Sequence, residues 1–208
     1  MKNLINFKSI LIPAACMAGI FIFATSCSEN KTSDSTDSMD VAETENVSRL
    51  TNDDDVAVVI DNDNGVKFLM AAAEMQMEEI SLGKLAQQNG TSEDVKALGK
   101  MMEADHTKTL AELKTLAQSK SIAIPSTPTQ DSMDTHKDLM DKKGNDFGKA
   151  YADMMVEHHE DAIELFEDAA ENSNDAEIKA WAAQKLPGLR THLDHAKSIK
   201  EKTDKTAS

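Results

Sequence analysis

Residues 154–166 read MMVEHHEDAIELF, and a related stretch upstream, residues 101–113, reads MMEADHTKTLAEL. In each stretch a histidine follows a methionine by four positions: His106 follows Met102, and His159 follows Met155. Side chains four residues apart lie on one face of an α-helix. The two stretches therefore predict two helices that each present a methionine and a histidine on one face. That face is either a metal site or ordinary core.

The helical pattern extends over four segments of the chain. Apolar residues recur in each at intervals of three and four, and Asn-Gly, proline or Gly-Asn-Asp interrupts the pattern between segments. The predicted helices span residues 66–88, from a cap at 91–94 to about 120, 147–171 and 175–200, with a short helix near 133–142 in the long connection. One apolar stripe on each helix is what a bundle requires. The predicted fold is therefore all-α, an antiparallel four-helix bundle made of two helical hairpins.

Composition supports this fold and excludes some functions. The chain has 208 residues, of which 40% are hydrophobic but only 4% aromatic, and its formal net charge is -15. Few aromatic residues favour helices over a β-sandwich. A strongly acidic surface repels nucleic acid, so a nucleic-acid partner is excluded. Protein partners remain unknown at this stage.

The N-terminus resembles a bacterial export leader. Residues 1–26 combine two early lysines with an apolar segment of signal-peptide length. The segment ends Ala24-Thr25-Ser26-Cys27, which resembles a lipobox with alanine where leucine is usual. We expect lipidation of Cys27 and attachment to a membrane through the acyl chains. A plain cleaved signal peptide and an uncleaved anchor are the alternatives.

The predicted organisation has four parts. Residues 1–26 are a lipoprotein-type signal peptide, and residues 27–64 are a polar, flexible and disordered linker. Residues 65–200 form the bundle, and residues 201–208 are a frayed polar tail. The expected location is the cell envelope, either the periplasm or the outer membrane.

Every predicted long helix carries an imidazole or a carboxylate near its middle. The first has Glu78 and Glu79, the second Glu103-x-x-His106, the third His158-His159, and the fourth His192-x-x-His195. Bundle metal sites are built from such side chains on facing helices. Imidazole ligands suit zinc, copper and iron, so the expected cofactor is a transition metal ion.

Two other interpretations compete with a metal site. The histidines can be structural, half-buried side chains that donate hydrogen bonds to Asp105, Glu79 or the backbone. A di-iron oxidase is disfavoured, because only Glu103-x-x-His106 has the required spacing. The sequence contains no phosphate-binding glycine loop, no Gly-x-Ser-x-Gly and no His-Glu-x-x-His, so an enzyme is less expected than a binding protein.

Four spaced motifs together resemble a known family. They are Glu79-Ile80-x-Leu82-Gly83, Met102-x-x-Asp105-His106, Met155-Val156-x-x-His159 and Leu186-Pro187-x-Leu189-x-x-His192. This set resembles the bacterial exported family called domain of unknown function 4142. The resemblance implies a ferritin-like four-helix bundle, export, and importance of Glu79, His106, His159 and His192. It also favours His159 over His158 and leaves His195 as an accessory residue. The Glu103-x-x-His106 spacing makes Glu103 a second candidate accessory ligand.

The leading functional hypothesis is an envelope lipoprotein that binds one transition metal, Cu, Zn or Fe, through Glu79, His106, His159 and His192. The alternative is a helical scaffold without metal, or a stress-related interaction module.

Overall fold

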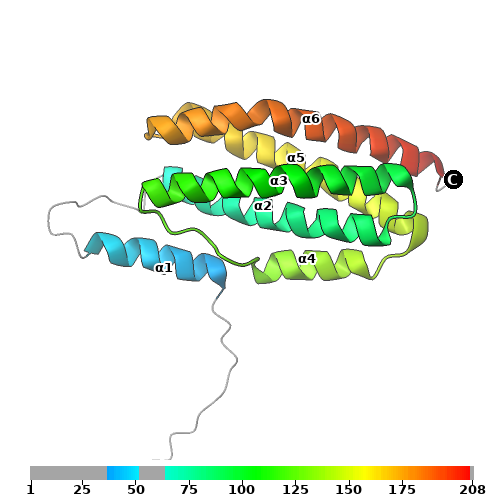
Figure 1. The fold of residues 1–208 in the computed structure, drawn as a ribbon, viewed down its shortest axis with the longest axis horizontal. Coiled ribbons are helices and arrows are strands. Elements are labelled where there is room, and N and C mark those ends of the chain that lie inside the picture. Colours follow the sequence, from blue (N-terminus) through cyan, green and yellow to red (C-terminus); the bar gives the residue numbers. More distant parts are fainter. Residues whose placement is uncertain (1–36, 52–63, 207–208) are drawn as a thin grey trace, which may run out of the picture. The chain divides into compact units, whose positions relative to one another are not determined.

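Six α-helices make up the residues that the computed structural model describes, 37–51 and 64–206 (Figure 1). Their bounds are α1 Ser38–Thr51, α2 Asn64–Asn89, α3 Glu93–Ser119, α4 Gln130–Met140, α5 Gly144–Asn172 and α6 Ala176–Thr206. The predicted all-α fold is confirmed, and the four long predicted helices correspond to α2, α3, α5 and α6. The short helix expected in the long connection is α4.

Helices α2 and α3 form one tight hairpin. They approach so closely at Gly83 and Gly99 that a Cβ on Gly99 would lie 2.6 Å from the Gly83 carbonyl oxygen. Seven residues from each glycine, Gln76 on α2 and His106 on α3 are hydrogen-bonded at 2.8 Å. The glycine contact therefore sets the antiparallel register that brings Gln76 to His106.

Helices α5 and α6 form the second hairpin, and α6 is longer than predicted. Asp175 caps α6 by accepting hydrogen bonds from the backbone N–H groups of Glu177 and Ile178. The last turns of α6 pair with other helices through Lys202 with Asp94, at 2.8 Å, and through Asp204 with Lys149. The prediction of a frayed tail from residue 201 is therefore wrong up to Thr206, because these ion pairs join the end of α6 to α3 and to α5.

Part of the predicted flexible linker is also helical. Helix α1 falls within residues 27–64, and its Asn46 side chain both donates to the Ala123 carbonyl at 2.9 Å and accepts from the Ala123 N–H at 2.7 Å. Ala42 is buried in a small cluster with Val66 and Met70. The prediction of a disordered linker is therefore wrong for α1. Its polar composition does not reveal that Asn46 bonds to Ala123 or that Ala42 packs against Val66 and Met70.

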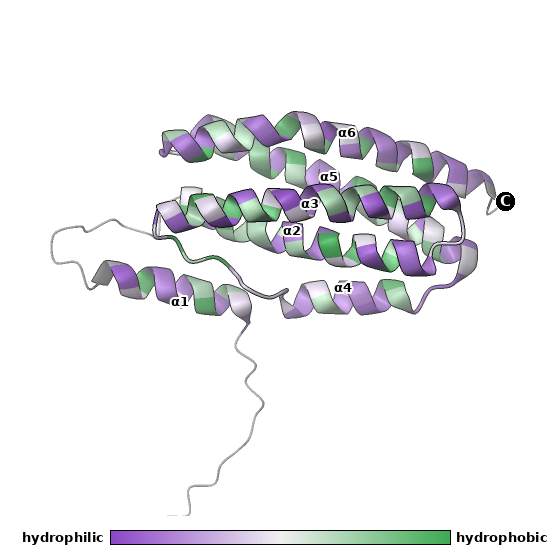
Figure 2. Cartoon of the chain, in the orientation of Figure 1, coloured by the Kyte–Doolittle hydropathy of each residue, from purple (hydrophilic) through white to green (hydrophobic). Residues whose placement is uncertain are grey.

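The buried faces of the four long helices change from apolar to polar and back to apolar at the same level of the bundle. One apolar cluster contains Phe68, Phe166 and Trp181, and a second contains Phe147 and Tyr151. On each long helix, residues of the first cluster and residues of the second are separated by buried polar positions: Gln76 and Glu79 on α2, His106 on α3, His159 on α5 and His192 on α6. We call these five residues the polar layer. Figure 2 shows polar and apolar residues alternating along each helix.

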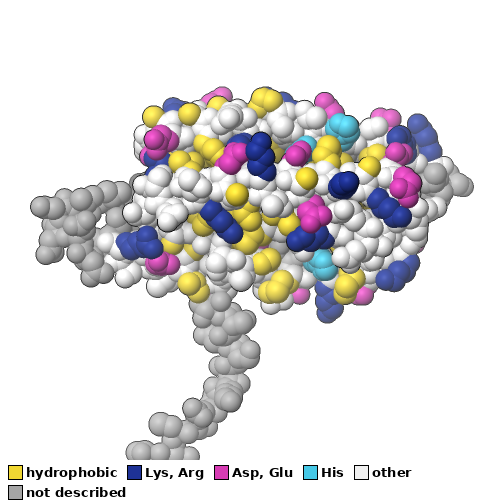
Figure 3. Space-filling view, viewed as in Figure 1, with side chains coloured by type: hydrophobic (Ala, Val, Ile, Leu, Met, Phe, Trp, Pro, Cys, Tyr) yellow, Lys and Arg dark blue, Asp and Glu magenta, His cyan; other side chains and the backbone are white. Residues whose placement is uncertain are grey.

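The predicted leader, the lipidation site Cys27 and the linker outside α1 lie beyond the described residues. Among the helices that are described, none is both long enough and apolar enough to cross a membrane. Acidic and basic side chains are interspersed over the face shown in Figure 3.

Candidate metal centre

Three buried histidines meet in the polar layer, one each from α3, α5 and α6. The exposed fractions of His106, His159 and His192 are 3%, 1% and 6%. Their ring centroids are 5.2 to 5.5 Å apart, and one nitrogen from each ring lies within 4.8 Å of the other two. Each histidine reaches this point because its helix places the same face toward the apolar clusters on either side.

The outer nitrogen of each ring is used in a hydrogen bond. His106 Nδ1 lies 2.8 Å from Gln76 Oε1, and His159 Nδ1 lies 2.8 Å from the Met155 carbonyl oxygen. His192 Nε2 lies 3.0 Å from Asp105 Oδ2. All three partners are acceptors, so each of these ring nitrogens carries the proton.

It follows that the three inner nitrogens carry lone pairs when the rings are neutral. They are His106 Nε2, His159 Nε2 and His192 Nδ1. The last two face each other at 3.4 Å, and His106 Nε2 has no hydrogen-bond partner among the described residues. Three electron-pair donors thus converge in a buried space, which is the arrangement that a cation requires.

One of the three spacings between the inner nitrogens matches tetrahedral coordination of a metal ion. Two nitrogens each about 2.0–2.1 Å from one ion and at tetrahedral angles lie about 3.4 Å apart. This is the separation found between His159 Nε2 and His192 Nδ1. The carboxylate of Asp105 behind His192 is the outer partner that commonly orients a metal-binding imidazole.

Burial keeps the centre neutral. It lowers the pKa of His106 from its usual 6.5 to about 4, although the charge of Glu79 opposes this effect. Burial also lowers the pKa of His159. At neutral pH both rings therefore retain their lone pairs and are ready to bind a metal.

Glu79 and His158 form a pair beside the three histidines. Glu79 is buried, and its Oε1 accepts a hydrogen bond from His158 Nδ1 at 3.1 Å. Burial alone would raise the pKa of Glu79, but the hydrogen bond from His158 opposes this effect, and the pKa lies below its usual value. For His158, burial opposes the same hydrogen bond, and the pKa is raised. Glu79 is therefore an anion held next to the centre.

The structure brings together some of the predicted residues and not others. His106, His159 and His192 form the cluster, while Glu79 lines the same cavity as His106 and His159 but is bonded to His158. Glu103, a predicted accessory ligand, instead accepts a hydrogen bond from Gln87 at 2.7 Å. His195 is exposed on α6. Neither accessory residue is in the cluster.

Two contributors to the site are not predicted from the sequence. Gln76 fixes the tautomer of His106, and His158 fixes Glu79. The signal for Gln76 was present: it is an amide within an apolar stripe, three residues before Glu79. The sequence predicts Asp105 as a partner of structural histidines, and Asp105 is also part of the Met102-x-x-Asp105-His106 motif. Its bond to His192 agrees with that interpretation, as does the bond of His159 to the backbone. These bonds use the outer nitrogens, however, and they do not explain why the inner nitrogens converge.

The sequence of this chain matches a known protein family. The family model described as "Domain of unknown function (DUF4142)" matches residues 59–199. The chain belongs to the DUF4142 family. In this member, the matched region contains all five residues of the polar layer. A comparison with curated proteins found no match.

A solved structure with a similar fold is the crystal structure of a DUF305 fragment from Deinococcus radiodurans. The TM-score is 0.59 and the sequence identity is 11%, with 67% of this chain and 96% of that chain covered. At this identity the similarity concerns the fold alone. The DUF4142 chain therefore shares a helical architecture with that fragment.

Proposed function

We propose that this DUF4142 protein binds one transition metal ion, zinc or copper, between His106, His159 and His192. The convergence of the three inner nitrogens supports this proposal more than any other observation. A set of imidazole ligands suits both metals. Three histidines also leave a further coordination position open.

The charges near the centre favour a cation. Glu79 is a buried anion in the cavity that His106 and His159 line. Asp105 adds a second carboxylate behind His192. A divalent ion held by three neutral imidazoles would thus have two nearby negative charges, which offset part of the cost of removing it from water.

Metal uptake by the purified metal-free protein tests the proposal. We expect about one equivalent of Zn²⁺ or Cu²⁺ per chain and a rise in melting temperature on binding. The double variant His106→Ala, His159→Ala should lose uptake and the thermal shift together. His195→Ala removes an imidazole outside the cluster and should behave as the wild type.

Unchanged stoichiometry in the double variant would contradict the proposal. So would wild-type protein whose melting temperature does not respond to either metal. Both measurements need a circular dichroism spectrum of each variant, because the comparison is valid only between folded proteins.

We also propose that the protein works in the cell envelope, attached through a lipid on Cys27. The leader-like residues 1–26 and the lipobox-like residues 24–27 support this location. Cells that produce the chain should incorporate labelled fatty acid into it. The Cys27→Ser variant should carry no label, and label on that variant would contradict lipidation at this residue.

A helical scaffold without metal is the second candidate function. Large apolar side chains are exposed on the two short helices: Val41 and Val47 on α1, and Met133 and Met140 on α4. Such residues can contact a protein partner. This candidate predicts no metal-dependent thermal shift, so the uptake experiment separates the two functions.

A further inference from the structure

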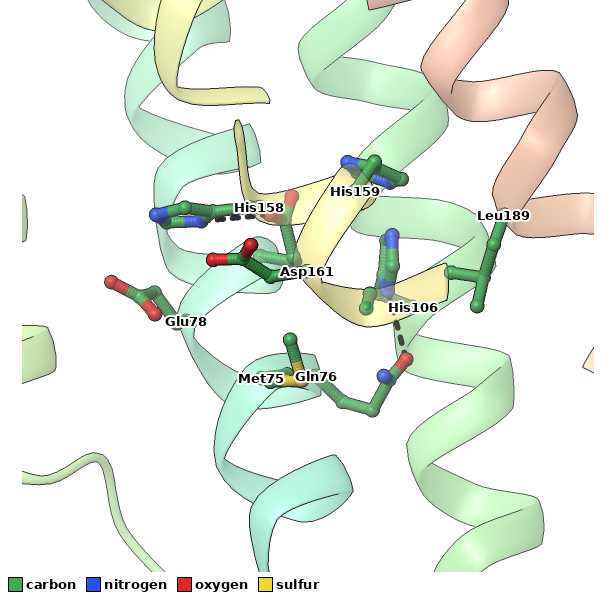
Figure 4. A pocket seen from close by; sticks show the side chains of 10 residues that line it. Met75, Gln76, Glu78, His106, His158, His159, Asp161 and Leu189 are labelled. Carbon is green, nitrogen blue, oxygen red and sulfur yellow. Dashed lines mark hydrogen bonds and ion pairs between the residues drawn. The ribbon is translucent and has the colours of Figure 1, made fainter. Parts of the chain in front are cut away.

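A cavity lies beside the three histidines, between α2 and α5. Its volume is about 210 Å³, and its polar lining consists of Gln76, Glu78, Glu79, His106, His158, His159 and Asp161 (Figure 4). Met75, Ala162 and Leu189 provide apolar walls. Since one water molecule takes up about 30 Å³ in the liquid, the cavity has room for about seven water molecules or for a ligand with a similar number of non-hydrogen atoms.

Two residues that line this cavity each have one buried polar atom without a partner. His106 Nε2 and Glu79 Oε2 make no hydrogen bond within the described residues. Both are electron-pair donors, and in a hydrogen bond an ionised carboxylate oxygen can accept but cannot donate. A metal ion would satisfy the imidazole. The carboxylate oxygen would then remain without a hydrogen-bond donor.

Glu79 is held so that this oxygen stays available. His158 donates to Oε1, which occupies one side of the carboxylate and leaves Oε2 directed elsewhere. The Tyr151 hydroxyl is also buried and has no partner in the part of the chain described. Burial, followed by the charge of Glu79, raises the pKa of Tyr151 well above its usual value, so this hydroxyl stays protonated near Glu79.

We infer that the cavity binds a small neutral molecule with an O–H or N–H group, of which water is the simplest, and that Glu79 selects it. The inference rests on the proposed metal site. The ligand places a lone pair on the open coordination position and donates its hydrogen to Glu79 Oε2. A small monoanion that lacks a proton is disfavoured, because it would meet the Glu79 charge without being able to donate. Glu79 is thus a specificity residue, and His158 is a positioning residue.

A second cavity, of about 220 Å³, opens between α3 and α6 on another side of His106. It is lined by His192, Asp105, Glu112 and Lys185. Lys185 forms an ion pair with Glu112, and Asp105 accepts from His192. These pairings leave the α2–α5 cavity, with its available carboxylate oxygen, as the better site for a donor ligand.

Azide binding to the Co²⁺-loaded full-length protein tests the inference, since Co²⁺ absorbance reports on coordinated ligands. We expect weak azide binding to wild type and at least about tenfold tighter binding to Glu79→Gln, whose amide donates and carries no charge. Glu164→Gln is the matched control, because it removes one charge from an exposed position on α5. It should bind azide as the wild type does.

The wild type alone provides a second measurement. Hydroxylamine carries no charge at slightly alkaline pH and has O–H and N–H groups. It should bind at least about tenfold more tightly than azide. This result does not require the Glu79 variant to fold.

Two results would overturn the selection by Glu79 while the metal site stands. One is equal azide affinity in wild type and Glu79→Gln, including the absence of binding in both. The other is azide binding to wild type as tight as, or tighter than, hydroxylamine binding. If wild type takes up neither Co²⁺ nor Zn²⁺, the proposed metal site itself fails.

Discussion

The polar layer and the two apolar clusters that flank it occupy the same helices but have different energetics. Phe166 and Phe147, one in each cluster, are fully buried, and such side chains stabilise the fold by removing apolar surface from water. The polar layer has equally low exposure, yet it contains three imidazoles, a carboxylate and an amide. Burial of such groups costs free energy unless each polar atom finds a partner.

The difference indicates what the layer is for. The outer histidine nitrogens are paired with Gln76, Met155 and Asp105, and Glu79 is paired with His158. The inner nitrogens converge, and one oxygen of Glu79 has no partner among the described residues. A layer selected only for stability would be apolar here, as it is above and below. A layer built for a ligand retains this cost, and the flanking clusters supply the stability.

The largest effect is expected in an apolar cluster. Phe166→Ala leaves a cavity beside Phe68 and Trp181, whose ring centroids lie 4.9 and 5.6 Å from that of Phe166. We expect a loss of about 3–5 kcal/mol in the free energy of unfolding, measured by urea denaturation. Zinc affinity of the folded variant should stay within about threefold of wild type, because the histidines are in another layer. A much larger loss of affinity would show that the layers are not separable.

A somewhat smaller effect is expected where α2 meets α3. Gly99→Ala places a methyl group 2.6 Å from the Gly83 oxygen and 2.7 Å from Ala86 Cβ, so the two helices must separate. We expect a loss of about 1–3 kcal/mol and weaker zinc binding, because the contact between Gln76 and His106 depends on the register of these helices. Isothermal titration and urea denaturation measure the two effects.

Gly188→Ala is the control for the glycine substitution. Gly188 lies inside α6, and a Cβ there would meet no atom within 4 Å among the described residues. Alanine is the better helix former, so this variant should be more stable by up to about 1 kcal/mol. If Gly99→Ala and Gly188→Ala both destabilise the protein, the close packing of α2 and α3 is not the cause of the loss at Gly99.

The layers also differ in how well the sequence predicts them. The apolar clusters follow from periodicity, and this was enough to predict the all-α fold and the approximate bounds of α2, α3, α5 and α6. Periodicity also places His106, His159 and His192 on inward faces. It says nothing about which ring nitrogen faces inward, because that depends on hydrogen bonds between distant residues such as Asp105 and His192.

The errors have the same origin. The polar composition of α1 predicts disorder. The prediction fails because Asn46 bonds to the backbone of Ala123, which is 77 residues away. The polar end of α6 predicts fraying. This prediction fails because the end pairs with Asp94 on α3 and with Lys149 on α5. Local composition carries no information about such contacts.

An intermediate effect is expected from pH, and it should come from the polar layer. The pKa of His106 is about 4 in the folded protein and 6.5 in the unfolded chain, so the unfolded chain binds a proton first as the pH falls. This difference costs nothing well above pH 6.5 and grows as the pH falls toward 4. At pH 5 it amounts to about 2 kcal/mol for the metal-free protein.

A comparison with His106→Leu isolates this contribution from those of Glu79 and His158. The difference in unfolding free energy between wild type and variant should change by about 2 kcal/mol between pH 7 and pH 5, in favour of the variant at low pH. Urea denaturation at the two pH values measures it. A constant difference would mean that His106 is not kept neutral by burial.

The smallest change in stability is expected when the polar layer is made apolar at one contact. Gln76→Leu alone deprives the buried Nδ1–H of His106 of its acceptor and should cost about 1–3 kcal/mol. The double variant Gln76→Leu, His106→Leu removes both partners. Its stability should lie within about 1 kcal/mol of metal-free wild type, and it should lose zinc binding. Urea denaturation without metal and zinc titration measure the two properties. If the double variant is less stable than metal-free wild type by clearly more than about 1 kcal/mol, the polar pair itself stabilises the fold, and the layer does not serve a ligand alone.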